Sequence, residues 1–292
     1  MNQRIWTQVT VKVPPEREDP VSDFLTTLTG RGVCIRAESG LSVIDAFLEP
    51  GESEDHLLRI EKQLSDLVEM KLLPEDSRYE IGELPEEDWM AVFRSQHTTV
   101  RISDRLVIRP TWCTPTGDLE VVLDPGLAFG TGSHATTRMC LVLLDDIIGH
   151  QAPERMFDLG TGSGILAIAA AYLGIGDVLA VDIDSMAVSV ACENVQNNNA
   201  DDRVRVAEGG MEAAEGLYGI ITANLSASLL KRLALNMAEH LKPGGWLIIS
   251  GFLEDESAEV MEAFTHSGLK VERIMNEKVW VAALLVSPIG NE

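Results

Sequence analysis

The 292-residue sequence has few cysteines and no long apolar run, and each shortage excludes a class of protein. Its four cysteines, Cys34, Cys113, Cys140 and Cys192, form no C-x-x-C pair and are irregularly spaced. A disulfide framework and a zinc site are therefore disfavoured, and we expect a reducing, cytoplasmic environment. The most apolar window, "GILAIAAAYLGIG", is too short to span a bilayer and is typical of a buried helix. The first residues lack an apolar segment, so we expect no signal peptide.

Basic residues are also scarce, since 23 of them stand against 46 acidic residues and give a formal net charge of −23. A surface this acidic repels phosphate backbones, so direct binding to nucleic acid is disfavoured. The charge favours a basic protein partner, although solubility alone also explains it. The histidines show no metal-ligand spacing, and we expect no metal site.

Residues 1–84 carry the pattern of a small α+β domain. Alternating β-branched residues predict a strand at Trp6–Val13, and a short helix follows at 20–32. Two strands at 33–39 and 41–50, an amphipathic helix from 53 to 71 and a strand at 77–84 complete the series. This β-α-β-β-α-β order predicts a ferredoxin-like domain.

The rest of the chain predicts a linker and a larger α/β domain. Residues 85–97 begin with proline and acidic residues, which favours a short linker helix. Within 98–292, two extended stretches come first, and strands and helices then alternate. Strands are expected near 155–160, 177–183, 203–208, 218–225 and 245–251, and helices at 165–173, 185–197, 227–241 and 254–266. Two further strands within 268–287 lack an intervening helix. We therefore predict a Rossmann-like, mostly parallel seven-stranded sheet with an antiparallel terminal strand.

The four residues GTGS occur twice, at 130–133 and at 160–163. The second copy lies between a predicted strand and a predicted helix, where α/β folds bind ligands. Gly160, Gly162 and Gly164 give G-x-G-x-G, which differs from the G-x-G-x-x-G of dinucleotide-binding proteins. Asp182 ends the next strand, where a carboxylate can accept both hydroxyls of a ribose. This combination favours an adenosine-type cofactor over a purely structural turn.

The arrangement resembles the class I S-adenosylmethionine-dependent methyltransferases, and "LKPGGWLIISG" matches the Pro-Gly-Gly turn before their fifth strand. The segments "LDPGLAFGTGSHATT", "FDLGTGSGILAIAA" and "ANLSASLL" are similar, more specifically, to the ribosomal protein L11 methyltransferase family (PrmA). With "IRPTW", "EEDW" and the small N-terminal domain, the similarity covers nearly the whole chain. One departure is Asn224-Leu225, where many members have Asn-Ile.

This resemblance implies S-adenosylmethionine as methyl donor and amino groups of ribosomal protein L11 as acceptors. The acceptors would be lysine side chains and the N-terminal amine, on free L11 or on the large ribosomal subunit. It further implies that the first GTGS loop covers the cofactor, while the second forms the floor of its site. The implied cofactor-binding residues are Phe129, Gly130, Thr137, Gly160, Gly162, Asp182 and Asn224.

Methyl transfer to nitrogen requires a neutral amine, and lysine has an unperturbed pKa near 10.4. At the end of a strand beside the cofactor loop, the neutral carbonyl of Asn224 can accept an N–H and orient the amine, so we predict Asn224 as the catalytic residue. An aspartate there would favour the ammonium form. His134 is expected to cap or pack rather than to titrate. Trp112 and Phe129 either line the cofactor pocket or pack in the core.

The sequence leaves other functions open. The rivals are a methyltransferase of another protein lysine, a glutamine or a nucleic-acid amino group, a non-catalytic ribosome-assembly module, and a nicotinamide oxidoreductase. The sequence Asn224-Leu225-Ser226-Ala227 offers no aromatic platform for a flipped base, which disfavours nucleic acid. Intact Gly160, Asp182 and Asn224 disfavour the non-catalytic module. The small N-terminal domain, which contains no cofactor motif, is expected to recognise the protein substrate.

Overall fold

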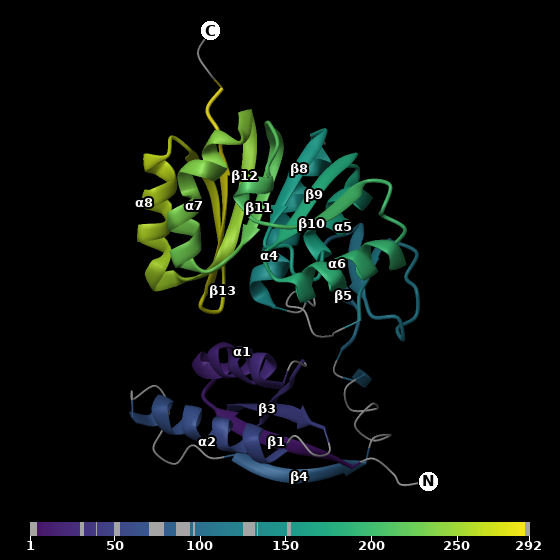
Figure 1. Ribbon diagram of the computed structural model, residues 1–292, viewed down its shortest axis with the longest axis vertical. Helices are drawn as coiled ribbons and strands as arrows, with labels where there is room; N and C mark the ends of the chain where they lie inside the picture. The colour runs from purple at the N-terminus through teal and green to yellow at the C-terminus, as the bar shows by residue number, and fades with distance from the viewer. Residues whose placement is uncertain are drawn as a thin grey trace. The chain divides into compact units, whose positions relative to one another are not determined.

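A computed structural model describes residues 5–29, 32–38, 40–49, 53–69, 79–85, 94–95, 97–124, 132, 134–150 and 153–289. The chain forms two compact units, and the first break between them along the sequence lies between Thr98 and Thr99 (Figure 1). Most of the predicted linker helix, namely 86–93 and 96, lies outside the described residues.

The first unit has the predicted β-α-β-β-α-β order. Its elements are β1 (Ile5–Val13), a 3-10 turn (Pro15–Arg17), α1 (Glu18–Thr29), β2 (Cys34–Glu38), β3 (Leu41–Leu48), α2 (Ser53–Glu69) and β4 (Tyr79–Pro85). The strands form one sheet in the order β2-β3-β1-β4, and every neighbouring pair is antiparallel. This order confirms the ferredoxin-like prediction.

Alternation along β1 explains the core of this unit. Val9, Val11 and Val13 are fully buried and share one cluster with Ile60 and Leu64 of α2. Because alternate strand residues face one side of a sheet, the valines form the surface on which the apolar stripe of α2 packs.

The second unit contains the larger sheet. Its elements are β5 (Val100–Arg101), β6 (Leu106–Arg109), β7 (Leu119–Val122), α4 (Ala135–His150), β8 (Arg155–Leu159), α5 (Ile165–Leu173), β9 (Asp177–Asp182), α6 (Ser185–Asn197), β10 (Val204–Glu208), β11 (Tyr218–Asn224), α7 (Ala227–Glu239), β12 (Leu241–Leu253), α8 (Ser257–His266), β13 (Lys270–Glu277) and β14 (Trp280–Val286), with 3-10 turns at Met211–Ala213 and Glu254–Glu256. The strand order is β10-β9-β8-β11-β12-β14-β13. β14 runs antiparallel to both neighbours, β12 and β13. The predicted sheet is confirmed: its antiparallel strand, β14, is the last strand of the chain and lies between β12 and β13.

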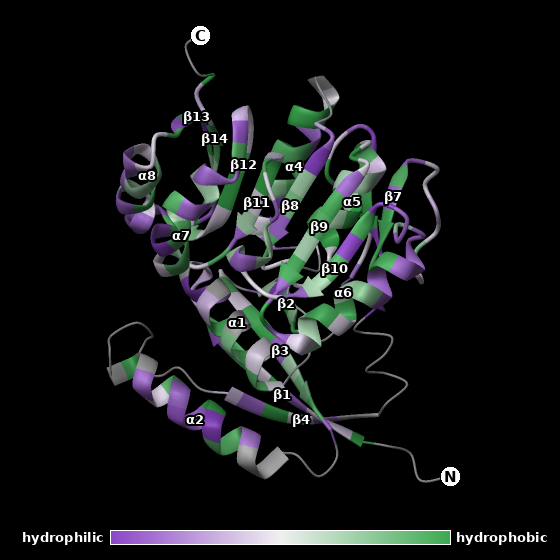
Figure 2. Cartoon of the chain, turned by 45° about the horizontal axis from the view of Figure 1, so that its top comes forward, coloured by the Kyte–Doolittle hydropathy of each residue, from purple (hydrophilic) through white to green (hydrophobic). Residues whose placement is uncertain are grey.

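Helices cover both faces of this sheet. Residues of α4 and α5 share a buried cluster with Met156 and Val178, whereas residues of α7 and α8 share another with Phe157 and Leu179. Neighbouring residues of β8 and β9 therefore face opposite layers, which is why these strands are apolar on both sides. Figure 2 shows α5 and β9 as predominantly hydrophobic ribbons.

Three local features differ from the sequence-based expectations. The two extended stretches after residue 98 form a separate three-stranded sheet, β5-β6-β7, and the helix α4 was not among the helices predicted by residue range. α7 ends at Glu239, two residues before the predicted end, because Leu241 already pairs with Tyr218 of β11. The Pro243–Gly245 segment consequently belongs to β12 instead of forming a separate turn before it.

The chain builds the sheet outward from β8 in two directions: β9 and β10 lie on one side of β8, and β11 and the later strands lie on the other. Ligands of open α/β sheets bind at the carboxyl ends of the strands beside such a change of direction. The residues that follow β8, β9 and β11 therefore define the candidate site. In the described part of the chain, no helix has the length and apolar character needed to cross a membrane.

Candidate active site

The glycine loop after β8 turns sharply and is held by the neighbouring strand. Gly160, Gly162 and Gly164 have φ values of 72°, 55° and 82°, in the left-handed region that favours glycine. The amides of Gly160 and Thr161 both donate to the carbonyl of Val181, each at 2.9 Å. A Cβ on Gly160 would lie 2.5 Å from Cδ2 of the Leu225 side chain, so a larger residue there would have to displace that side chain as well as adopt an unfavourable φ.

Asp182 lies directly against this loop. Its Oδ2 accepts the Gly162 amide at 2.9 Å, and its Oδ1 accepts the Asp184 amide at 3.1 Å. Each carboxylate oxygen retains a lone pair, so the group can still accept hydrogen bonds from two hydroxyls. The backbone thus fixes the orientation of a half-buried acid at the end of β9.

A second acid, Asp158 on β8, lies beneath the loop and is buried. It accepts hydrogen bonds from the hydroxyls of Thr161 at 2.6 Å and Thr222 at 2.5 Å. Burial raises the pKa of Asp158 to about 6, although both hydroxyl contacts act to lower it. Asp158 therefore links the glycine loop to β11, two residues before Asn224.

Asn224 ends β11 and is oriented by the first turn of α4. Its Nδ2 donates to Thr136 Oγ1 at 3.2 Å, and Thr136 Oγ1 lies 2.7 Å from His134 Nδ1. The His134 ring contacts Trp280 edge-on, with ring centroids 5.1 Å apart. Because Nδ2 is engaged by Thr136, the amide orientation leaves Oδ1 as the acceptor for another group.

Gly251 provides space beside that acceptor. A Cβ at this position would lie 3.0 Å from Asn224 Oδ1 and 2.5 Å from the carbonyl oxygen of Leu225. Gly251 has a φ of 93° and sits where the pairing of β12 with β14 shifts register. The irregularity lets β12 approach the end of β11 without a side chain intruding on Asn224.

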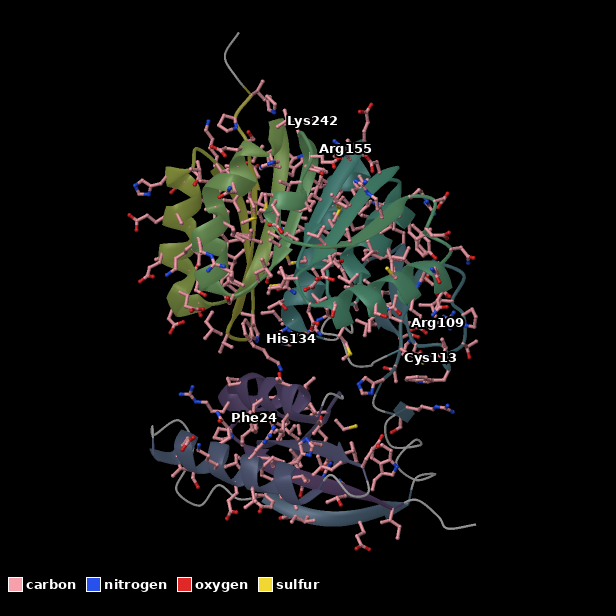
Figure 3. All side chains as sticks on the ribbon, in the orientation of Figure 1. Phe24, Arg109, Cys113, His134, Arg155 and Lys242 are labelled. Atoms are coloured by element: carbon pink, nitrogen blue, oxygen red, sulfur yellow. The ribbon has the colours of Figure 1, made fainter. Side chains whose placement is uncertain are left out.

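Thr137 adds a polar atom that the described residues leave unsatisfied. Its side chain is only 1% exposed, and its Oγ1 has no hydrogen-bond partner among those residues. A buried hydroxyl without a partner is unfavourable, so a bound ligand that accepts or donates there would be stabilised. Figure 3 places His134, three residues before Thr137, at one end of the α/β unit and Arg155, the first residue of β8, at the other.

Most predicted site residues follow strands at one edge of the sheet. Gly160, Gly162 and Asp182 contact one another directly or through Val181, and Asn224 is bonded to the neighbour of Thr137. Phe129 and Gly130 lie outside the described residues. Trp112 lies half-buried in the loop between β6 and β7.

Sequence reasoning missed Thr136, Asp158 and Gly251. Thr136 lies within the segment LDPGLAFGTGSHATT, and Asp158 lies within FDLGTGSGILAIAA. Asp158 could have been identified as a polar residue inside an otherwise apolar strand. For Gly251, the signal was a glycine at the end of a buried strand. No group of three or more His, Cys, Asp or Glu side chains suited to a metal ion occurs in the described part of the chain.

The chain is similar in sequence and in structure to proteins described as ribosomal protein L11 methyltransferases. The profile of the family described as ribosomal protein L11 methyltransferase (PrmA) matches residues 5–287. A protein of that name from Geobacter sp. (strain M21) is 36% identical over 97% of this chain and 99% of its own length. One from Chloroflexus aurantiacus is 36% identical over 97% and 98%. The crystal structure of a ribosomal protein L11 methylase from Lactobacillus delbrueckii subsp. bulgaricus superposes with a TM-score of 0.58 at 29% identity, covering 66% of this chain and 100% of that one.

Proposed function

The chain belongs to the ribosomal protein L11 methyltransferase family, and we propose that it transfers methyl groups from S-adenosylmethionine to amino groups of ribosomal protein L11. The acceptors are lysine side chains and the N-terminal amine, and the reaction takes place in the cytoplasm. The observation that carries this proposal is the oriented, uncharged amide of Asn224 at the same sheet edge as the glycine loop and Asp182.

The residues present fit the cofactor. Asp182 offers free lone pairs to the ribose hydroxyls, and Gly160 and Gly162 let the backbone approach the ligand closely. The buried hydroxyl of Thr137 is satisfied once a ligand group binds it. Ile183, which follows Asp182, is 78% exposed and offers an apolar surface beside the ribose position. S-adenosylmethionine supplies an activated methyl group on a sulfonium.

Asn224 acts on the acceptor. Its Oδ1 accepts an N–H of the substrate amine, which turns the nitrogen lone pair toward the methyl donor. Because the amide carries no charge, it does not stabilise the ammonium form, whereas a carboxylate would raise the pKa of the amine. Gly251 leaves room beside Oδ1 for the incoming nitrogen. Holding the reactants in line and excluding water are the main contributions of the chain to catalysis.

We assign residues 98–292 to methyl transfer, residues 1–84 to recognition of L11, free or on the large subunit, and residues 85–97 to a linker. The first unit is a complete two-layer domain with its own core, and it contains no cofactor motif. A separate recognition domain that repositions would help to present several amines to a single site.

The activity is tested by incubating the full chain, S-adenosylmethionine and purified L11, followed by mass spectrometry of L11. We expect mass increases by whole methyl groups, mapped to amines, that accumulate far more slowly with the Asn224→Ala variant. Methylation confined to another protein, or to RNA in ribosomal fractions, would disprove the assignment to L11.

The domain assignment is tested by removing residues 1–84. The shortened chain should bind S-adenosylmethionine nearly as well as the full chain but lose methylation of L11. Should it still methylate L11 at near full-length kcat/KM, the recognition role is wrong. A joint loss of melting temperature and cofactor affinity would instead assign a supporting role to the first unit.

A further inference from the structure

One face of α6 packs against the glycine loop at Ser163 and Gly164. Ala187, Ala191, Asn194 and Asn198 follow one another at spacings of four, three and four residues, which places them on one side of a helix. Ala187 and Ala191 are buried, and a Cβ on Gly164 would lie 3.4 Å from Ala191 Cβ. Small side chains thus allow the helix to approach the loop closely.

Asn194 adds a direct bond to the loop at this approach. Its Nδ2 donates to the carbonyl of Ser163 at 2.8 Å, across 31 residues of sequence. Ser163 is only 5% exposed, so its carbonyl has little access to water and depends on the protein for a partner. The same loop is also held through Gly162, whose amide donates to Asp182.

The hydrogen bond from Asn194 to Ser163 restrains the glycine loop. A loop with three left-handed glycines has large conformational freedom when it is not restrained, and fixing it costs entropy. The bond from Asn194 fixes the peptide plane that joins Ser163 to Gly164. α6 itself starts at the ribose acid, because Asp184 caps the helix and its amide donates to Asp182. One rigid element therefore positions both the acid and the far half of the loop.

We propose that Asn194 is a positioning residue that sets the affinity of the site for S-adenosylmethionine by pre-ordering the Gly162–Gly164 turn. Asn194 acts through the Ser163 carbonyl, and the ligand contacts come from the loop and Asp182. This inference rests on the proposed cofactor but not on the identity of the methylated substrate. Without the anchor, part of the ligand's binding free energy is consumed in ordering the loop.

Asn198, which caps the C-terminal end of α6 four residues after Asn194, supplies a matched control. Its side-chain amide donates to the carbonyl of Val122 in β7 and accepts the Val122 amide, both at 2.8 Å. It also donates to the carbonyl of Asn194 at 2.8 Å. Removing this side chain breaks more hydrogen bonds than removing that of Asn194, but none of them involves the glycine loop. Its loss should therefore affect stability rather than the cofactor.

The experiment measures S-adenosylmethionine affinity by calorimetry and melting temperature for the full-length protein and three variants. Asn194→Ala and Asn194→Ser should each weaken binding roughly two- to tenfold, the range of one neutral hydrogen bond. Asn198→Ala should lower the melting temperature at least as much while leaving affinity within about twofold. With saturating cofactor, kcat of the Asn194 variants should match that of the unmodified protein.

Two outcomes would overturn the inference. Unchanged affinity in a folded Asn194 variant would show that the loop needs no anchor there, and equal weakening in Asn198→Ala would assign the effect to general stability. If one Asn194 variant does not fold, the other decides. Absence of binding by the unmodified protein would instead overturn the proposed cofactor, so the two failures remain distinguishable.

Discussion

The ends of β9 and β11 lie on opposite sides of β8 at the same edge of the sheet, and each presents one polar side chain. Asp182 at the end of β9 is charged and is oriented by two backbone amides. Asn224 at the end of β11 is neutral and is oriented by the Thr136 hydroxyl, which comes from a different element. The two strand ends therefore differ both in charge and in the kind of group that orients them.

The proposed function explains this difference by what each end would bind. Ribose hydroxyls are neutral donors, so a carboxylate strengthens their hydrogen bonds. An acceptor amine must lose a proton before it reacts, and a carboxylate beside it would oppose that loss. Substitutions at the end of β9 should accordingly lower the affinity for S-adenosylmethionine, and substitutions at the end of β11 should lower the rate of methyl transfer.

The largest effect should come from making the two ends alike with Asn224→Asp. The new carboxylate stabilises the ammonium form of the substrate, so the single-turnover rate with saturating cofactor should fall at least about a hundredfold near neutral pH. Part of that rate should return as pH rises, because the amine then deprotonates. Asn224→Ala serves as control, since it should also be slow but without the added pH dependence. Near-normal rates in both variants would rule out the orienting role.

The next largest effect is expected at the other strand end. Asp182→Ala should weaken S-adenosylmethionine binding about ten- to a hundredfold, because hydrogen bonds to a charged group contribute roughly 1.5–3 kcal/mol. The affinity of Asp182→Asn should lie between that of the unmodified protein and that of Asp182→Ala, since asparagine retains one acceptor oxygen. Calorimetry measures the affinity, and circular dichroism checks that the variants stay folded. Equal affinity in all three proteins would contradict the ribose role.

The β9 end was more predictable from sequence than the β11 end, and the reason is distance along the chain. Asp182 and the glycine loop are adjacent elements of one β-α-β unit, so their proximity follows from local pattern. Thr136 meets Asn224 across 88 residues, and Asn194 meets Ser163 across 31, through packing that one sequence does not specify. The same holds for the end of α7, which depends on the pairing of Leu241 with Tyr218.

The fold as a whole was predictable because strand and helix periods are strong signals in both units. The elements that the sequence did not reveal were α4 and the short strands β5 to β7. Apolar residues cover most of the surface of α4, so it has no clear polar face. Two- and four-residue strands carry too few alternations to be distinguished from extended loops.

A smaller effect on rate should follow from Thr136→Val, which keeps the shape of the side chain but removes the acceptor for Asn224 Nδ2. The amide can then rotate, and kcat should fall roughly two- to tenfold with cofactor affinity nearly unchanged. Thr136→Ser retains the hydroxyl and should restore most of the rate. If the serine and valine variants are equally slow, packing of the methyl group rather than the hydrogen bond explains the effect.

The smallest effect on activity is expected from Asp158→Asn, at the buried acid that bonds to both the glycine loop and β11. Burial raises the pKa of Asp158 to about 6, from the value of 3.8 that is usual for an exposed aspartate. The folded state therefore binds its proton more tightly between about pH 4 and pH 6, and stability falls as pH rises through that window. The shift corresponds to about 3 kcal/mol, or several degrees in melting temperature.

Asparagine is isosteric with Asp158 and carries no proton to lose. Its oxygen can accept from one of Thr161 and Thr222 while its amide donates to the other, so both contacts to the loop and to β11 persist. Melting temperatures measured from pH 4.5 to 7.5 should therefore converge at low pH and separate as pH rises, with the variant the more stable. Asp202→Asn, an exposed site with 74% side-chain exposure, should follow the unmodified protein at every pH. Parallel curves for Asp158→Asn and the unmodified protein would mean that this acid does not titrate in the window. A large loss of rate would mean that its charge, not only its contacts, acts on the reaction.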